Sequence, residues 1–540
     1  MSPIAEWYET AVFYEIYLRS FADGNADGIG DLSGLIDRLD YLVDLGIDCL
    51  WLQPFFPSPL RDDGYDVADY CDIHPDYGTL NDFDRLLTEA HARQLRVIVD
   101  LVPNHTSDQH AWFQQARADR NSPYRPYYVW SDDSNRYSKA RIIFLDSQAS
   151  NWTWDPLAGQ YYWHRFFPFQ PDLNFDCTEV QEQMLRVLRS WLERGVDGFR
   201  VDAVPYLVER EGTDCENLPE THAFLKRMRA LIDEHYPGRV LLAEANQRPM
   251  DLLPYFGQGD EFQMAFNFPL MPRIFEALKR GSRTPIEAIL SQTPTPPPGC
   301  QWCTFLRNHD ELTLEMVEDH ERAWMWSEYA PEPDMRLNLG IRRRLAPLLD
   351  GDRRKVELAH SLLLTLAGTP ILYYGDEIGM GDDTRLEDRR GLRTPMQWSS
   401  AGAAGFTTGA QPHLPPIATG PFAFDRVNVA AQVKDPTSLW QAVRRMLAIR
   451  KQSPALTLGT ARILPLLDPA LLAIERRQED QRVVALHNLG ATERQVNLTA
   501  LSDAPTPQVQ VIVASEVSFS PTSCLNLPAF SWCWLLMANG

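Results

Sequence analysis

The chain has 540 residues, which is too long for one ordinary hydrophobic core, so its length predicts two or three domains. Hydrophobic residues make up 44% of it and charged residues 23%, a balance typical of globular rather than disordered chains. The formal net charge of -22 argues against nucleic acid or an anionic membrane as partner. We therefore expect a small neutral or cationic ligand, although acidity also serves ordinary solubility.

The N-terminus shows no targeting segment. Its first 20 residues hold neither a basic stretch followed by an apolar one nor a small-residue cleavage site. The apolar runs fall short of the ~20 residues that span a bilayer. The 8 cysteines are scattered, and the single CxxC, at Cys300 and Cys303, lacks the second pair of a zinc site. These features predict a cytoplasmic protein with free thiols and no membrane anchor, either a monomer or a homo-oligomer.

Short apolar runs alternate with longer amphipathic ones through most of the chain. Helical patterns such as 32–46 and 80–94 separate runs that are typical of buried strands. The candidate strands are 11–21, 47–54, 95–102, 196–204, 239–246, 261–268, 302–310 and 370–377. Strand–helix alternation implies parallel pairing, and eight such runs predict an α/β fold that closes into a (β/α)8 TIM barrel. In that barrel the C-terminal strand ends and the loops after them form the site.

Two connections are far longer than the usual ~2–6 residues and need structure of their own. The first, 106–176, follows the third strand, is rich in Tyr, Trp and Pro, and is predicted to form an insertion subdomain B. The second, 311–352, follows the seventh strand, is heavily charged, and is predicted to be a lid insertion. The catalytic barrel then comprises 1–105 and 177–452, including the lid insertion. From 453 to 540, short alternating runs between turns predict a C-terminal antiparallel β-sandwich domain.

Charged side chains stand at the ends of several predicted strands. Asp100 lies near the end of the third, Asp202 near the end of the fourth, Glu244 in the fifth and Asp310 at the end of the seventh. Any one of them alone is more often a satisfied structural residue, because an unpaired buried charge is costly. Three acids from different strands that meet at one rim favour chemistry instead. Such groups can act as nucleophile, acid/base and transition-state stabiliser in glycosidic bond cleavage.

Four short segments, taken together, carry a family resemblance. DLVPNHTS, GFRVDAV, LLAEAN and FLRNHDE occur in this order and resemble the signature regions of the α-amylase superfamily, glycoside hydrolase family 13. Further segments, including DAVPYLVEREGTDCENLPETHAFLKR, NHDELTLEMV and YYGDEIGMGD, are similar to the trehalose synthase branch of that family. The resemblance implies a retaining α-glucosyl transfer that isomerises maltose to trehalose, with some hydrolysis to glucose. An α-glucosidase or amylase acting on maltose or short maltooligosaccharides stays open as an alternative, as does an inactive carbohydrate-binding homologue.

The resemblance also implies roles for individual residues. Asp202 corresponds to the nucleophile, Glu244 to the general acid/base and Asp310 to the transition-state stabiliser. Arg200 lies two residues before Asp202 on the same strand face, where its cation would keep that carboxylate ionised. The residues predicted to bind the substrate are Asp62, Tyr65, His105, Gln170, Arg200, Tyr206, His309, Glu311, Arg389 and Arg393. For Arg389, and for Glu315 in the lid, a solvated helix face is an equal alternative.

An isomerase must exclude water, so that the released glucose can attack the intermediate from which it came. The lid insertion is the candidate for this task. Glu311 and Glu315 would face the same way if their segment were helical. Together with Tyr206 they would cover the second sugar.

The segment 23–31 predicts a cation loop. It resembles the first half of an EF-hand loop, with ligands at alternating positions. The predicted ligands are Asp23, Asn25, Asp27, the carbonyl of Ile29 and Asp31. Position twelve is Gly34 instead of Glu, so a calcium or magnesium loop of another type competes with a bare Asx turn.

A structural calcium site is implied by the family resemblance, whereas no organic cofactor is expected. Oxygen ligands alone suit a hard cation. Its predicted ligands are Asn104, Asp172, Glu209 and the carbonyls of Tyr206 and Leu207. The ion would tie the first insertion to the loop after the fourth strand.

Overall fold

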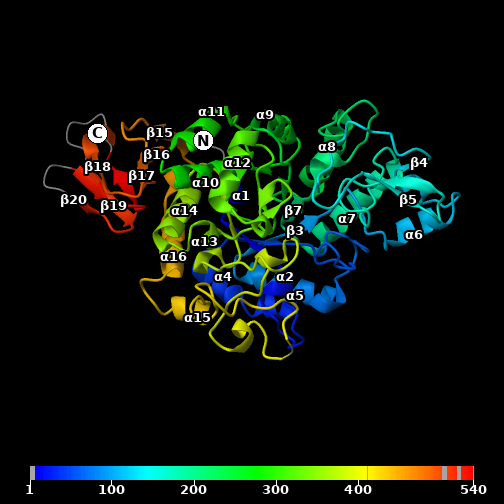
Figure 1. The fold of residues 1–540 in the computed structure, drawn as a ribbon, viewed down its shortest axis with the longest axis horizontal. Helices are drawn as coiled ribbons and strands as arrows, with labels where there is room; N and C mark the ends of the chain where they lie inside the picture. The colour runs from blue at the N-terminus through cyan, green and yellow to red at the C-terminus, as the bar shows by residue number, and fades with distance from the viewer. Residues whose placement is uncertain (1–5, 410, 502–507, 520–523, 539–540) are drawn as a thin grey trace.

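A computed structural model describes residues 6–409, 411–501, 508–519 and 524–538. Its centre is a closed barrel of eight parallel strands (Figure 1). The barrel strands are β1 (Phe13–Ile16), β2 (Cys49–Leu52), β3 (Arg96–Leu101), β7 (Gly198–Val201), β8 (Val240–Ala243), β9 (Met264–Phe266), β10 (Gln301–Phe305) and β14 (Thr369–Tyr373). They follow one another around the barrel in chain order, and β14 pairs with β1 to close it. Each predicted run overlaps one of these strands, so the predicted (β/α)8 barrel is confirmed.

Amphipathic helices cover the outside of the barrel. In α5 (Leu80–Ala92) the buried side chains recur at the helical period, which is why this face packs inward: Phe83, Leu86, Leu87 and Ala90. The other long barrel helices are α7 (Thr178–Arg194), α8 (Pro219–His235), α10 (Leu270–Arg280), α11 (Thr284–Gln292), α14 (Arg353–Thr365) and α16 (Leu439–Gln452). The short helices α3 (Leu32–Ile36) and α4 (Leu39–Leu45) follow β1.

The insertion after β3 has its own small sheet, which projects to one side of the barrel (Figure 1). It contains α6 (Ala111–Ala118), β4 (Trp130–Ser131), β5 (Trp152–Asp155) and β6 (Gln160–Trp163). Its small core includes Trp152, Trp163 and also Cys215, which belongs to the loop after β7. The insertion therefore packs against the very loop that follows the strand bearing Arg200 and Asp202.

The insertion after β10 begins as a strand, not as a helix. β11 (Leu312–Thr313) pairs with β13 (Gly340–Ile341), which also pairs with β12 (Arg336–Leu337). The helix α12 (Asp319–Tyr329) starts later, behind a capping box of Glu318 and Glu321. The helical arrangement considered for Glu311 and Glu315 is therefore wrong, because pairing with a distant strand takes precedence over the local spacing.

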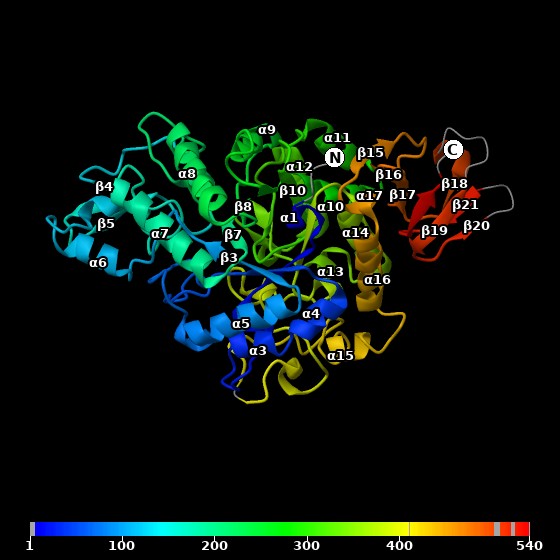
Figure 2. The ribbon, with the colours of Figure 1, turned by 180° about the vertical axis from the view of Figure 1, so that it is seen from behind.

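The C-terminal region is made of antiparallel sheets, as predicted. The larger sheet holds β15 (Thr460–Leu464), β16 (Leu471–Gln478), β17 (Gln481–Asn488), β22 (Trp532–Met537) and β19 (Val509–Ala514). The smaller holds β18 (Arg494–Asn497), β21 (Cys524–Leu527) and β20 (Ser518–Phe519). Figure 2 shows these sheets beside α14 and α16, at the end of the molecule opposite the first insertion. The exact limits of the predicted domains stay a prediction, since α17 (Pro454–Thr457) contacts both α16 and β16.

No helix in the described ranges is both long enough and apolar enough to cross a bilayer.

Candidate active site

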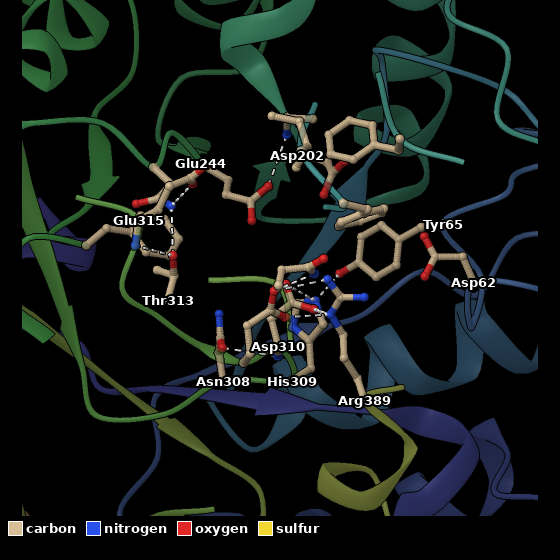
Figure 3. A pocket seen from close by; sticks show the side chains of 18 of the residues that line it. Asp62, Tyr65, Asp202, Glu244, Asn308, His309, Asp310, Thr313, Glu315 and Arg389 are labelled. Atoms are coloured by element: carbon tan, nitrogen blue, oxygen red, sulfur yellow. Dashed lines mark hydrogen bonds and ion pairs between the residues drawn. The ribbon is translucent and has the colours of Figure 1, made fainter. Parts of the chain in front are cut away.

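A pocket opens at the C-terminal ends of the barrel strands and is walled by the loops and insertions that follow them. Asp202 comes directly after β7, Glu244 directly after β8, and Asp310 lies in the loop after β10. All three line the pocket, and Figure 3 shows Asp202 and Glu244 facing Asp310 across it. Parallel strands in a closed barrel bring their C-terminal ends to one rim, which is why acids far apart in sequence meet here.

Arg200 lies beneath these acids and contacts two of them. It is 1% exposed, and its Nη1 is 2.6 Å from Asp202 Oδ1. Its Nη2 is 2.7 Å from Glu244 Oε1, and Nη1 is also 2.7 Å from Asp100 Oδ1. Arg200 does not line the pocket in this structure. The geometry makes it a cationic clamp behind the carboxyl groups, and a direct contact between Arg200 and a substrate stays a prediction.

The two acids on this clamp differ in how readily they ionise. Burial raises the pKa of Asp202 to about 6, although Arg200 opposes the effect. Burial raises the pKa of Glu244 further, to about 8, because the negative charges of Asp202 and Asp310 add to it. Near neutral pH the arrangement therefore offers one carboxylate anion and one carboxylic acid side by side.

Asp310 is the third acid, and two arginines and a histidine surround it. Its Oδ1 is 2.8 Å from Arg389 Nε and 3.2 Å from Arg393 Nη2, and its Oδ2 is 3.3 Å from His309 Nε2. Burial alone would raise its pKa, but His309 and the two arginines hold it well below the usual value. Asp63, which the sequence reasoning missed, anchors Arg393 at 2.6 Å. Asp310 is thus a fixed negative charge at the pocket wall.

Aromatic and polar groups complete one end of the pocket. The Tyr65 hydroxyl is 2.9 Å from His309 Nε2, and the Tyr65 carbonyl is 3.2 Å from His105 Nε2. Burial lowers the pKa of His105 to about 3, so this ring is neutral. Asp62 lines the pocket and accepts a hydrogen bond of 2.8 Å from Gln170 Nε2. Gln170 itself is fully buried outside the pocket lining, where it supports Asp62, and its contact with a substrate stays a prediction.

A network that joins four separate loops lies at the other end of the pocket, where Tyr206, Asn246 and Glu315 line it. Arg141, from the first insertion, forms ion pairs with Glu216 and Glu315 and donates to the Tyr206 hydroxyl at 3.1 Å. Asn246 Nδ2 donates to Glu315 Oε2 at 2.7 Å. The sequence reasoning missed Arg141, Glu216 and Asn246, because their partners lie in distant segments and leave no local pattern.

The residues predicted for the second sugar subsite are spread around the pocket, with Arg389 beside Asp310 and away from Glu315 (Figure 3). Glu311, Glu315, Tyr206 and Arg389 all line the pocket. Arg389 is 5% exposed, with its Nε 2.9 Å from Glu311 Oε2. The alternative of a solvated helix face therefore does not describe Arg389 or Glu315.

The predicted calcium ligands gather where the first insertion meets the loop after β7. Asn104 Oδ1, Asp172 Oδ2 and Glu209 Oε1 are buried and lack a hydrogen-bond partner among the described residues. Burial raises the pKa of Asp172 to about 8, and burial together with Asp172 raises that of Glu209 well above its usual value. A hard cation would satisfy all three oxygens and offset the two charges, so these residues fit calcium. No cluster of three or more His, Cys, Asp or Glu side chains that could hold a metal occurs in the described ranges.

The loop 23–31 is arranged by its own side chains. Asp23 Oδ1 accepts from the Asn25 amide at 3.0 Å, and Asn25 Oδ1 accepts from the Asp27 amide at 2.9 Å. Asp31 caps α3 through the Gly34 amide at 2.6 Å. These contacts are those of successive Asx turns, the competing interpretation, and a cation in this loop stays a prediction.

Calcium should stabilise the protein through the site of Asp172 and Glu209. After treatment with a chelator, adding Ca²⁺ at about 100 times its Kd should stabilise the fold by about 2.7 kcal/mol and raise the midpoint of thermal unfolding. Glu209→Gln should remove most of this shift, whereas Asp27→Asn, in the other loop, should preserve it. Differential scanning calorimetry measures both, and an identical midpoint with and without Ca²⁺ would contradict the assignment.

A closed barrel with acidic side chains gathered at the C-terminal ends of its strands defines an enzyme of the (β/α)8 class. The chain belongs to the α-amylase family, because the model of the alpha amylase catalytic domain matches residues 15–330 and 337–459.

Two relatives match most of the chain. It is 56% identical over 507 residues to "Trehalose synthase/amylase TreS" of Mycolicibacterium smegmatis, covering 91% of this chain and 86% of that one. It is 55% identical over 508 residues to trehalose synthase of Pimelobacter sp. strain R48, covering 91% and 89%. Among solved structures, trehalulose synthase MutB from Pseudomonas mesoacidophila MX-45 matches with a TM-score of 0.80 at 29% identity, covering 99% of this chain and 100% of that one.

Proposed function

We propose that this enzyme isomerises maltose to trehalose by a retaining, intramolecular transfer of a glucosyl group. The observation that carries the proposal is the pair formed by Asp202 and Glu244, which share Arg200 but have pKa values raised to about 6 and about 8. Between those values one group is a nucleophilic anion and the other a proton donor, as a retaining mechanism requires. Similarity to trehalose synthases supports maltose as the substrate.

The chemistry follows from these two carboxyl groups. Glu244 protonates the glycosidic oxygen of maltose while Asp202 attacks the anomeric carbon, giving a β-glucosyl ester and a free glucose. The glucose turns within the pocket, and Glu244, now a carboxylate, removes the proton from its 1-hydroxyl. That oxygen attacks the ester carbon and releases Asp202. Two inversions preserve the α configuration and form the α,α-1,1 bond of trehalose.

Asp310 would stabilise the positive charge that develops on the sugar ring. Its two arginine partners and His309 keep it ionised, so its charge is in place before the reaction begins. Tyr65, which faces the same space, would present its ring to the glucose.

The wall at the second sugar subsite supports isomerisation over hydrolysis. Water competes with the bound glucose for the ester, so the pocket must stay closed until the second transfer. Arg141 joins the first insertion to Glu216 after β7 and to Glu315 after β10, and so ties three loops over the pocket. Asn338, in the β12–β13 turn, adds a further link by donating from its backbone amide to Asp146 of the first insertion at 2.6 Å.

Hydrolysis of maltose or short maltooligosaccharides is the second candidate function. The same two acids perform it if water reaches the ester. The Mycolicibacterium smegmatis relative is named both a trehalose synthase and an amylase, which favours some hydrolysis here as well.

Incubation with maltose tests the proposal directly. We expect trehalose to be the main product and glucose a minor one, because the closed wall retains the released sugar. Chromatography of the sugars over time measures both, and trehalose as starting material should yield maltose. A product mixture consisting mostly of glucose would reject isomerisation in favour of hydrolysis, and an absence of turnover would favour an inactive carbohydrate-binding protein.

Opening the wall should shift the products toward glucose. Arg141→Ala removes the ion pairs with Glu216 and Glu315, and bonds of this charge-assisted kind contribute about 1.5–3 kcal/mol each. We expect the ratio of glucose to trehalose to rise about tenfold. Arg120→Ala is the matched control, since Arg120 lies in the same insertion but donates to the carbonyls of Ala158 and Gly159. An unchanged product ratio in Arg141→Ala would show that this network does not exclude water.

A further inference from the structure

Glu15 is a fully buried acid in the middle of barrel strand β1, below the floor of the pocket. It is 0% exposed and is not among the pocket-lining residues. Its neighbours across the sheet are Trp51 and Tyr373. The proposed reaction gives this residue no task.

The carboxyl group of Glu15 makes two contacts through a single oxygen. Its Oε1 is 2.5 Å from Nδ1 of His309 and accepts from Gln53 Nε2 at 3.0 Å. Its Oε2 is buried and lacks a hydrogen-bond partner among the described residues. Burying a carboxylate anion costs free energy when one of its oxygens accepts no hydrogen bond. The cost is smaller for a protonated carboxyl group, because its carbonyl oxygen carries no net charge.

The other nitrogen of His309, Nε2, lies 2.9 Å from the Tyr65 hydroxyl and 3.3 Å from Asp310 Oδ2. The Tyr65 hydroxyl can donate to Asp100 Oδ2 at 3.2 Å, and it accepts from Arg200 Nη1 at 3.4 Å. Asp310 is paired with two arginines, so its carboxylate oxygen can only accept a hydrogen bond. A bare Nε2 would face that oxygen lone pair to lone pair, so the geometry favours a proton on Nε2.

A proton count then leaves two states for the pair formed by Glu15 and His309. Either the imidazole is neutral with a bare Nδ1, and Glu15 donates a proton to it, or the imidazole is a cation and Glu15 an anion. Two charged groups face the pair from the barrel strands: Arg200 of β7 and Asp100 of β3. The hydroxyl group of Tyr373 faces it from β14. The charged groups at the rim are Asp310, Arg389 and Arg393. Burial lowers the pKa of His309 well below its usual value and raises that of Glu15 well above its own. The neutral pair agrees with both directions and with the bare Oε2.

We propose that Glu15 is a positioning residue: a carboxylic acid that stays protonated, donates to Nδ1 of His309, and so fixes the tautomer whose Nε2–H lies at the pocket wall, within reach of Tyr65, Asp310 and a bound sugar. That a sugar binds there rests on the proposed function. In this arrangement His309 is a permanent donor beside Asp310, which accepts, so the two present opposite hydrogen-bonding groups to neighbouring hydroxyls. The pair adds no charge to a pocket that already holds three acids.

Infrared difference spectroscopy tests the protonation state without any substrate. The spectrum of the wild type minus that of Glu15→Gln should show the carbonyl band of a protonated carboxyl group, still present at mildly alkaline pH. Glu377→Gln is the matched control, because Glu377 is another fully buried glutamate, bound by the Tyr14 hydroxyl at 2.8 Å, and that variant should retain the Glu15 band. A difference spectrum with only a carboxylate band would overturn the proposal.

Kinetics test the positioning role. Glu15→Leu should lower kcat/KM for maltose by about 10–100-fold, the usual effect of removing the group that orients a working histidine. Glu15→Gln should restore most of that loss, because its amide can still donate to Nδ1. Equal kcat/KM in Glu15→Leu and the wild type would overturn the role, and if Glu15→Leu does not fold, the infrared result decides alone. A product mixture of mostly glucose would reject the isomerisation but leave the infrared result standing.

Discussion

Asp202→Asn should reduce the turnover of maltose by about 10⁴-fold or more, the largest single effect expected in this chain. The amide has nearly the shape of the carboxylate, so the fold and the contact with Arg200 should survive. It cannot form the glucosyl ester, because it is a far weaker nucleophile and carries no charge. Both trehalose and glucose formation depend on that ester, so both should disappear together.

The measurement is the initial rate of trehalose and glucose release, supported by mass spectrometry. A fluorinated glucosyl fluoride that forms the ester but releases it slowly should label the wild type at Asp202 and leave the variant unlabelled. Asp40→Asn is the control, since the Asp40 carboxylate is largely exposed and pairs with Arg93 on the barrel surface. If Asp202→Asn retained even about a tenth of the wild-type rate, the assignment of the nucleophile would be wrong.

The barrel and its three acids could be predicted because their signals are local. A run of apolar residues in the sequence predicts a buried strand, and a charged residue at the end of such a run is easily recognised. In a closed parallel barrel the strand ends necessarily meet, so Asp202, Glu244 and Asp310 are brought together by topology alone.

The closing network could not be predicted, because its members lie in different insertions. No pattern in the sequence around Arg141 indicates that it forms ion pairs with Glu216 and Glu315. The same holds for Leu312 and Thr313, whose pairing with Ile341 and Gly340 makes a strand where spacing allowed a helix.

Glu15 is an intermediate case. Its strand was predicted correctly, and a glutamate between Tyr14 and Ile16 in a fully buried strand is itself a signal. The sequence does not show that Glu15 contacts His309, because the two residues lie in opposite halves of the chain. They meet only because the barrel closes, with β14 pairing with both β1 and β10.

Glu244→Gln should lower the turnover of maltose by about 10³-fold, because the glycosidic oxygen would leave without its proton. α-Glucosyl fluoride should be affected much less in the step that forms the ester, since fluoride leaves without protonation. The comparison of the two substrates therefore isolates the acid function of Glu244 from its contact with Arg200. Glu234→Gln, a largely exposed side chain on α8, is the matched control.

The pH profile gives an independent test of the same assignment. In the wild type, activity should fall as the pH drops through about 6, where Asp202 gains a proton and ceases to be a nucleophile. It should fall again as the pH rises through about 8, where Glu244 loses the proton that the leaving sugar needs. With Glu244→Gln and glucosyl fluoride, ester formation no longer needs that proton, so the alkaline decline should vanish while the acidic one persists. An alkaline decline that survives in this variant would mean that the titration of a group other than Glu244 causes it.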